Sequence, residues 1–390
     1  MKKPYRKVII LIVAVCFSAA GFFGEPASAQ LKTAAKITPT PVKKKSTTTA
    51  KATPKPQPSV VAPKTAKTPV KTKSSTSQKD KSKQTSKSVS DPKPTPTVTE
   101  QVIVMATASR IHQQPKTNSA QLSLVKIGKT LPVTEKTPAW YRVEYADGKS
   151  GWISKTIVKN YETANRDEIY SEIADKYSRN NKLDFPAAAE VSEFLRTAQA
   201  LVKKDGLKAD LGFKRLQILA QAMRAVPFGK DDQQPYKNFL KAHEKEVVNS
   251  EPSGQWLVRS DLFWELHAKF TELPIAEEIA WAAAQNSIPG ECEGYVNCYL
   301  YLLRATDGEY LNFYPNGKYS KKALTNITNL LEPMVADLNE KSVYTPPSDI
   351  SDRAEFNRFL TELRTIISKM PDVDKAKTLQ QINQLGEGYK

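Results

Sequence analysis

The sequence predicts a multidomain protein in which a small all-β barrel precedes an all-α helical C-terminal region. A segment rich in lysine, threonine, proline and serine ends near residue 100. Alternating apolar and polar residues then predict short strands up to about residue 160. From residue 161 the apolar residues recur with the 3.6-residue period of amphipathic helices. We therefore expect a signal peptide at 1–29, a disordered linker at 30–100, a barrel at 101–160 and helices at 161–390.

The positive charge is confined to the first hundred residues. The chain carries a formal net charge of +17, but residues 101–390 hold 38 Lys/Arg and 37 Asp/Glu. The folded part is therefore nearly neutral. This distribution argues against a nucleic-acid-binding domain and favours a basic arm that meets an acidic polymer.

The N-terminus has the three parts of a secretory signal peptide. The basic residues Lys2, Lys3, Arg6 and Lys7 precede the apolar run at 8–15, and residues 27–29 (Ala-Ser-Ala) supply a small-residue cleavage site. We expect cleavage after Ala29. The alternative is an uncleaved membrane anchor, although the run from Val8 to Phe23 is just short of a bilayer span.

The segment at 30–100 has few bulky apolar residues, as Pro54-Lys55-Pro56 and Pro94-Thr95-Pro96 illustrate. Such a segment cannot offset the entropy lost on folding, so we expect a disordered, partly extended linker. Two interpretations stay open. The linker is either a spacer attracted to anionic wall or membrane polymers, or a solvated connection whose charge keeps it soluble.

The strongest local signal is a β-hairpin over residues 140–153. Residues 140, 142 and 144 alternate with residues 141, 143 and 145, the period-two pattern of a half-buried strand. Asp147-Gly148 fits a tight turn, since both residues tolerate a positive φ. Gly151 lets the returning strand begin close to its neighbour.

Several short stretches resemble the bacterial SH3-type domain family. They are Lys126-Ile127-Gly128, Leu131-Pro132-Val133, Trp140-Tyr141-Arg142-Val143 and Gly151-Trp152-Ile153. The resemblance implies an SH3-like barrel that targets proteins to the cell wall and holds peptidoglycan peptides. The run at 111–115 departs from the Asn-Val-Arg-x-Gly-Pro-like segment that is usual in the family.

Aromatic residues of the hairpin are the candidate ligand-binding residues. Trp140, Tyr141 and Tyr145 offer large contact areas at low entropic cost. A purely structural role in the barrel core is the alternative for each of them. For Trp152 we expect the core position.

Apolar periodicity predicts eight or nine helices, and no strand, over residues 161–390. Pro186 suits a helix start, Glu277 and Glu278 suit a first turn, and Asp352 and Glu355 have capping-box spacing. The piece from Tyr310 to Leu324 resembles the helix–turn–helix edge of tetratricopeptide-like repeats. A single helical domain with one such hairpin and a repeated solenoid both stay open.

Two cysteines remain after signal cleavage. Cys292 and Cys298 are close together in an exported chain, which predicts a disulfide. A catalytic thiol is the competing hypothesis, but it needs a nearby histidine base. The candidate bases are scattered along the chain, at His112, His243 and His267. No metal-ligand motif and no phosphate-binding glycine loop is present, so we expect no cofactor.

These observations predict an exported envelope protein, located in the periplasm, cell wall or extracellular space. We expect the barrel to bind peptidoglycan or another anionic envelope polymer, and the helical region to bind a protein partner as a scaffold. Nucleic acid is not expected, and a membrane is expected only if the signal stays uncleaved. The alternative is a peptidoglycan hydrolase with a catalytic glutamate in the helical region. Its candidates are Glu265, Glu272, Glu277, Glu278, Glu291 and Glu293.

Overall fold

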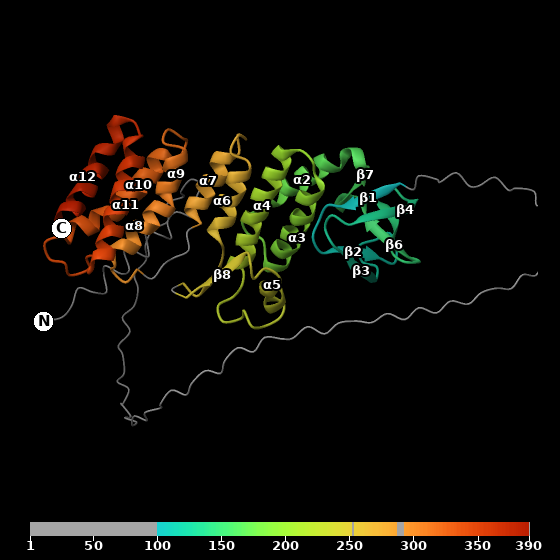
Figure 1. Ribbon diagram of the computed structural model, residues 1–390. Helices are drawn as coiled ribbons and strands as arrows, with labels where there is room; N and C mark the ends of the chain where they lie inside the picture. The colour runs from blue at the N-terminus through green and yellow to red at the C-terminus, as the bar shows by residue number, and fades with distance from the viewer. Residues whose placement is uncertain (1–99, 252, 287–291, 390) are drawn as a thin grey trace, which may run out of the picture. The chain divides into compact units, whose positions relative to one another are not determined.

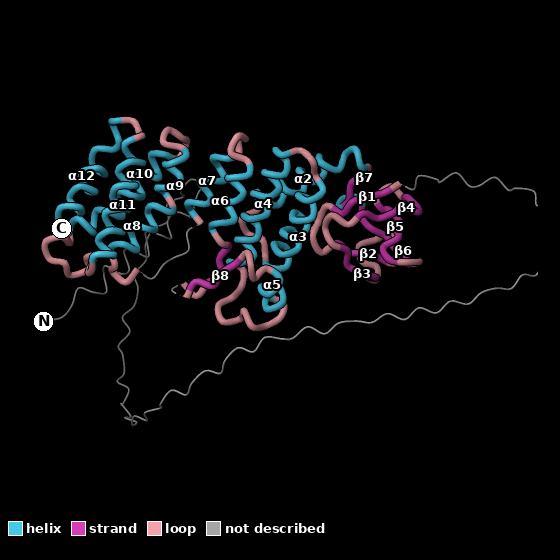
Figure 2. Tube along the Cα trace, viewed as in Figure 1, coloured by secondary structure: helices cyan, strands magenta, loops and turns pink. Residues whose placement is uncertain are grey.

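The computed structural model describes residues 100–251, 253–286 and 292–389. The predicted signal peptide at 1–29, and the predicted linker except Glu100, lie outside these residues. Strands come first in the described part and helices dominate after residue 161 (Figures 1 and 2). The described ranges contain no helix long and apolar enough to cross a membrane.

Seven antiparallel strands form the predicted barrel, which confirms the fold class. Their order in the sheet is β3-β2-β6-β5-β4-β1-β7. Eight fully or almost fully buried side chains, Ile111 and Val143 among them, form its core. The strands are β1 (Gln101–Val104), β2 (Ser109–His112), β3 (Gln121–Val125), β4 (Thr130–Lys136), β5 (Trp140–Ala146), β6 (Lys149–Ser154) and β7 (Val158–Tyr161).

The hairpin at 140–153 forms as predicted. Gly148 has φ +65°, a backbone conformation that favours glycine. Gly151 pairs with Val143, and a Cβ on Gly151 would overlap the buried side chain of Ile111. Both glycines are therefore required by local geometry.

The described residues after 161 contain eleven α-helices, more than the eight or nine predicted. The difference arises because short helices such as α5 and α9 are separate elements. The helices are α2 (Arg166–Ser178), α3 (Phe185–Leu201), α4 (Asp205–Arg224), α5 (Tyr236–Ala242), α6 (Ser260–Lys269), α7 (Ala276–Gln285), α8 (Val296–Ala305), α9 (Asp307–Phe313), α10 (Ser320–Ala336), α11 (Ile350–Ser368) and α12 (Asp372–Gly388).

Helix starts follow local capping chemistry. The Asp184 carboxylate accepts a hydrogen bond of 3.0 Å from the Ala187 amide at the start of α3. At the start of α11, Asp349 accepts one of 2.9 Å from the amide of Asp352. The predicted cap at Asp352 was therefore three residues late.

One antiparallel hairpin interrupts the helices, although no strand was predicted there. Strands β8 (Val247–Ser250) and β9 (Gln255–Val258) pair over their full length. Each has only four residues, too few for a period-two pattern to stand out from helical periodicity.

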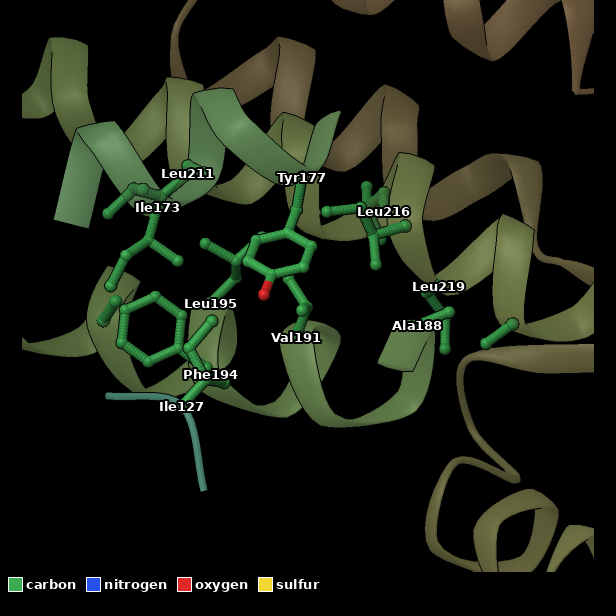
Figure 3. Close-up of a cluster of buried hydrophobic side chains, with 14 of the residues drawn as sticks. Ile127, Ile173, Tyr177, Ala188, Val191, Phe194, Leu195, Leu211, Leu216 and Leu219 are labelled. Carbon is green, nitrogen blue, oxygen red and sulfur yellow. The ribbon is translucent and has the colours of Figure 1, made fainter. Parts of the chain in front are cut away.

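The first helical core extends into the barrel. Ile103, Met105 and Ile127 of the barrel belong to the same buried cluster as side chains of α2, α3 and α4. Figure 3 shows Ile127 beside Phe194 of α3. Gly128 has φ +78°, and a Cβ there would lie less than 3 Å from the Phe194 ring. The barrel is thus packed tightly against α3.

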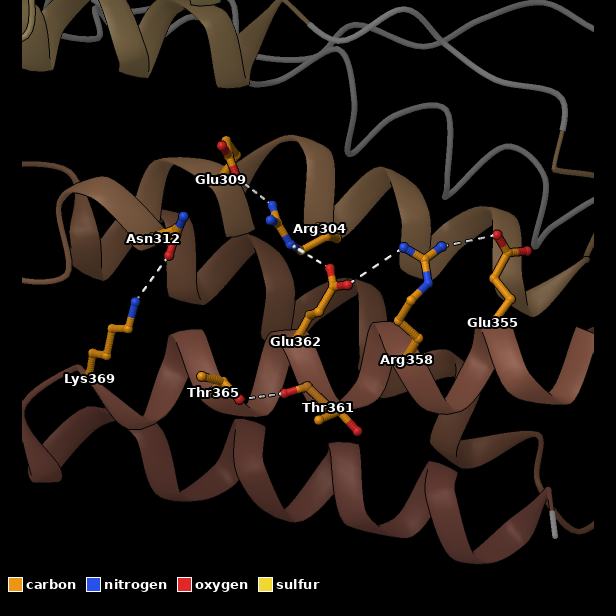
Figure 4. Close-up of polar contacts among 9 residues, drawn as sticks. All are labelled: Arg304, Glu309, Asn312, Glu355, Arg358, Thr361, Glu362, Thr365 and Lys369. Atoms are coloured by element: carbon orange, nitrogen blue, oxygen red, sulfur yellow. Dashed lines mark hydrogen bonds and ion pairs between the residues drawn. The ribbon is translucent and has the colours of Figure 1, made fainter. Parts of the chain in front are cut away.

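A second buried cluster joins α7 to α12. Ion pairs cross its surface (Figure 4): Arg304 of α8 bonds Glu362 of α11 at 2.9 Å and also Glu309 of α9. Lys369 donates a hydrogen bond of 3.1 Å to Asn312. These contacts connect three helices through side chains that are mostly half-exposed.

The turn between α9 and α10 brings polar groups to α7. The Tyr310 hydroxyl and the Lys318 amide donate hydrogen bonds of 2.6 and 2.5 Å to Glu277. A Cβ on Gly317 would lie 2.7 Å from the Tyr310 hydroxyl and closer still to Glu277. Glycine is therefore needed for close approach, and the tetratricopeptide resemblance of this hairpin stays a prediction.

Candidate binding site on the β-barrel

Strand register separates the two sides of the barrel sheet. Tyr141 pairs with the fully buried Ile153, so it faces the core. Arg142 pairs with Trp152 and therefore belongs to the opposite, outer side. Trp140 is two residues from Arg142 and shares that side.

Residues of β2 and β3 extend the same side. His112 pairs with Trp152, and Arg110 pairs with Leu124. Cross-strand partners project to one side of a sheet, so these four side chains lie together. We name the outer face by its members: Arg110, His112, Leu124, Trp140, Arg142, Trp152 and Ser154.

A pocket of about 340 Å³ opens at one end of the outer face. The loop at 106–108, part of β2, Trp140 and residues after β6 form its walls. Trp140 is 9% exposed, and its ring contacts that of His112 edge-to-face with centroids 5.4 Å apart. Trp140 therefore forms a packed wall of the pocket and is almost fully buried.

Polar groups line the rest of this pocket. The Ser154 and Thr156 hydroxyls lie 2.9 Å apart at one side, and Thr117 contributes another hydroxyl. Arg110 is exposed and has no ion-pair partner among the described residues. A free guanidinium beside hydroxyls is suited to carboxylate and amide groups of a ligand.

Tyr141 and Tyr145 do not join Trp140 at the pocket. Both rings are half-buried and pack against the barrel core. The Tyr141 hydroxyl donates a hydrogen bond of 3.2 Å to Asn160, and the Lys155 ammonium lies 4.7 Å from the ring centroid. The structure places one of the three predicted ligand-binding aromatics, Trp140, in a pocket wall.

Sequence reasoning missed Arg110, His112 and Thr156 as pocket residues. Alternation across Ile111, a core residue, could have placed Arg110 and His112 together on the opposite side. Trp152 was expected in the core, and that expectation was wrong. It is half-buried on the outer face because its neighbour Ile153 occupies the core side.

A second pocket of about 400 Å³ lies between α3 and α5, with apolar walls that include Phe185 and Phe239. At its polar end, His243 bonds Glu193 at 2.8 Å and Glu246 at 2.6 Å through its two ring nitrogens. The hydrogen bond with His243 lowers the pKa of Glu246 to about 2. Because both nitrogens are engaged, His243 joins α3 to the segment after α5.

Several residues considered for catalysis are held in structural contacts, and Glu291 lies outside the described residues. Cys292 and Cys298 form the predicted disulfide, with Cα atoms 5.4 Å apart, so neither is a free thiol. The His267 imidazole lies 2.9 Å from the Tyr314 hydroxyl. Glu278 accepts a hydrogen bond of 2.9 Å from Lys318. Within the described ranges, no group of three or more His, Cys, Asp or Glu could hold a metal ion.

Comparison with known families agrees with this geometry. Residues 107–159 match the family described as the bacterial SH3 domain. This confirms the resemblance from β2 to the start of β7 and says nothing about the helical region. Bacterial SH3 domains often bind cell-wall components and often occur in cell-envelope or exported proteins. No curated protein matched the chain.

Proposed function

We propose that this protein is exported to the cell envelope, where its barrel binds peptidoglycan peptides in the pocket beside Trp140. The observation that carries the proposal is Arg110, which has no ion-pair partner in the described part of the chain and lies at a pocket walled by an aromatic ring and hydroxyls. Peptidoglycan stem peptides are short and end in carboxylates. A guanidinium forms strong, directional hydrogen bonds to such groups, and hydroxyls can bond the peptide amides.

Export is supported from two parts of the chain. Residues 1–29 have the sequence pattern of a signal peptide. The Cys292–Cys298 disulfide is typical of oxidising compartments. The basic segment at 30–100 would add attraction to anionic wall polymers, and that contribution should weaken with salt.

The helical region would act as a protein-binding scaffold. Tyr301 and Phe313 are 56% and 47% exposed, and half-buried Trp264 lies beside Phe313 with ring centroids 6.1 Å apart. Exposed aromatic side chains on a rigid helical surface are common anchors for protein partners. Crosslinking in intact cells should then capture a partner with the unaltered protein and fail to capture it with Phe313→Ala.

Cosedimentation with purified peptidoglycan tests the wall-binding proposal. Arg110→Gln should weaken binding about tenfold or more, since a charged hydrogen bond to the ligand is lost. Arg142→Gln is the matched control, because Arg142 shares the outer face but bonds Glu135 at 3.4 Å. Equal losses in both variants, or a loss only in Tyr145→Ala, would place binding elsewhere.

The same preparation separates binding from hydrolysis. We expect the protein to pellet with peptidoglycan and to leave the turbidity of a peptidoglycan suspension unchanged. Clearing of the suspension would favour the hydrolase alternative. Glutamine variants at the six candidate glutamates would then identify the acid.

A further inference from the structure

The pocket wall formed by residues 106–108 is supported by the helices as well as by the barrel. This loop connects β1 to β2. Its Thr107 amide donates a hydrogen bond of 3.0 Å to the Tyr177 hydroxyl of α2. Its Ala108 amide donates one of 3.4 Å to the Glu190 carboxylate of α3. Two successive loop amides therefore find their acceptors on helices about 70 and 80 residues further along the chain.

The loop conformation needs this support. Ala108 has φ +49°, a left-handed conformation that is unfavourable for a residue with a Cβ. Such a conformation persists where surrounding contacts hold it. Within the barrel, the Ser109 hydroxyl donates a hydrogen bond of 2.7 Å to the Ala106 carbonyl, and the Met105 amide before the loop donates one of 2.8 Å to the Ile157 carbonyl.

The supporting residues are themselves firmly placed. Tyr177 is 7% exposed within the first helical core (Figure 3). The second oxygen of Glu190 accepts a hydrogen bond of 2.7 Å from the Ile127 amide, next to the Gly128–Phe194 contact. One carboxylate thus connects two separate barrel segments to α3. A lysine of α2 adds to the contact between barrel and helices, because Lys176 donates a hydrogen bond of 3.1 Å to the Met105 carbonyl.

We propose that Tyr177 and Glu190 are positioning residues for the barrel pocket, so that the helical region sets how tightly the barrel binds its ligand. This inference rests on the proposed wall-binding function. The apparent affinity of a site falls in proportion to the fraction of molecules in the binding-competent conformation. By linkage, ligand in the pocket strengthens the contact between barrel and helices by the same factor. A partner that shifts α2 or α3 would therefore change wall binding.

The test uses three single substitutions in the purified protein. Tyr177→Phe removes one acceptor and keeps the ring in the core. Glu190→Gln leaves one acceptor oxygen for two amides. Glu172→Gln is the matched control, because Glu172 of α2 bonds Lys159 of β7 at 2.6 Å and so joins the same two bodies away from the pocket.

Two measurements are made on each protein. Amide hydrogen exchange without ligand should be at least about tenfold faster at Thr107 and Ala108 in both test variants, and unchanged in Glu172→Gln. The dissociation constant for muramidase-solubilised peptidoglycan fragments should rise about three- to tenfold in the test variants and less than twofold in the control.

The outcomes separate this inference from the proposed function. If the unaltered protein does not bind the fragments, the proposed function fails, and faster exchange alone then shows that the helices hold the loop. If the fragments bind equally well to all four proteins, or if loop exchange is unchanged, the positioning role is overturned. Equal weakening in Glu172→Gln would also overturn it, since general loosening of the joint would then explain the loss.

Discussion

Replacing Gly128 by alanine should destabilise the protein more than replacing any other turn glycine of the barrel. Two effects combine at this position. The backbone has φ +78°, which costs a residue with a Cβ about 1 kcal/mol. The new Cβ would also overlap the ring of Phe194, which is 9% exposed, and overpacking costs about 1–3 kcal/mol. The expected loss of unfolding free energy is about 2–4 kcal/mol.

Gly148→Ala provides the matched control. Gly148 has φ +65°, but no atom lies within 4 Å of an added Cβ. Its loss should therefore be about 1 kcal/mol, from the backbone alone. Urea unfolding followed by far-ultraviolet circular dichroism measures both variants under the same conditions.

A double-mutant cycle isolates the contact with α3. In the background of Phe194→Ala, the added Cβ at Gly128 meets no ring. The combined loss should then fall short of the sum of the single losses by about 1–3 kcal/mol. Additive losses, or equal losses for Gly128→Ala and Gly148→Ala, would refute the packing of the barrel against α3.

Three further predictions concern the helical region. Burial raises the pKa of Asp307 to about 7, whereas the same carboxyl group in the unfolded chain loses its proton near pH 4. Between these two pH values the folded state holds one more proton than the unfolded state, so the free energy of unfolding falls as the pH rises. The stability advantage of Asp307→Asn over the unaltered protein should therefore grow from pH 4 to pH 8 and reach up to about 4 kcal/mol, as measured by urea unfolding. An advantage that does not change with pH would contradict this. Replacing both Cys292 and Cys298 by serine should cost about 2 kcal/mol, measured against the oxidised protein, because the closed loop is short. Gly317→Ala should cost about 1–3 kcal/mol through overlap with Glu277, and Gly206→Ala, at a position with open space, should not destabilise.

Features encoded within a few neighbouring residues were predictable. The hairpin at 140–153 follows from strict alternation and a glycine turn. The acidic first turn of α7 follows from Glu277 and Glu278. Four-residue strands such as β8 carry too few positions for such a pattern, so they were missed.

The candidate site was predictable only in part, because its geometry depends on pairing. Alternation places Trp140 and Tyr141 on opposite sides of β5, but it does not say which side is covered. That follows from the pairing of Tyr141 with buried Ile153, which no local pattern reveals. Likewise, nothing near Ala108 in the sequence signals a contact with Glu190, 82 residues away.

The shared core has a consequence for moving this module to another protein. The family match covers residues 107–159. Ile103, Met105 and Ile127 are covered by helices that follow it in the chain. Fusing the matched segment to a different protein would expose Ile127 to solvent. Fusing a longer segment that begins at Gln101 would expose all three side chains. An exposed apolar patch of this kind promotes self-association. A segment that keeps these side chains covered must therefore extend beyond residue 159 into the helices.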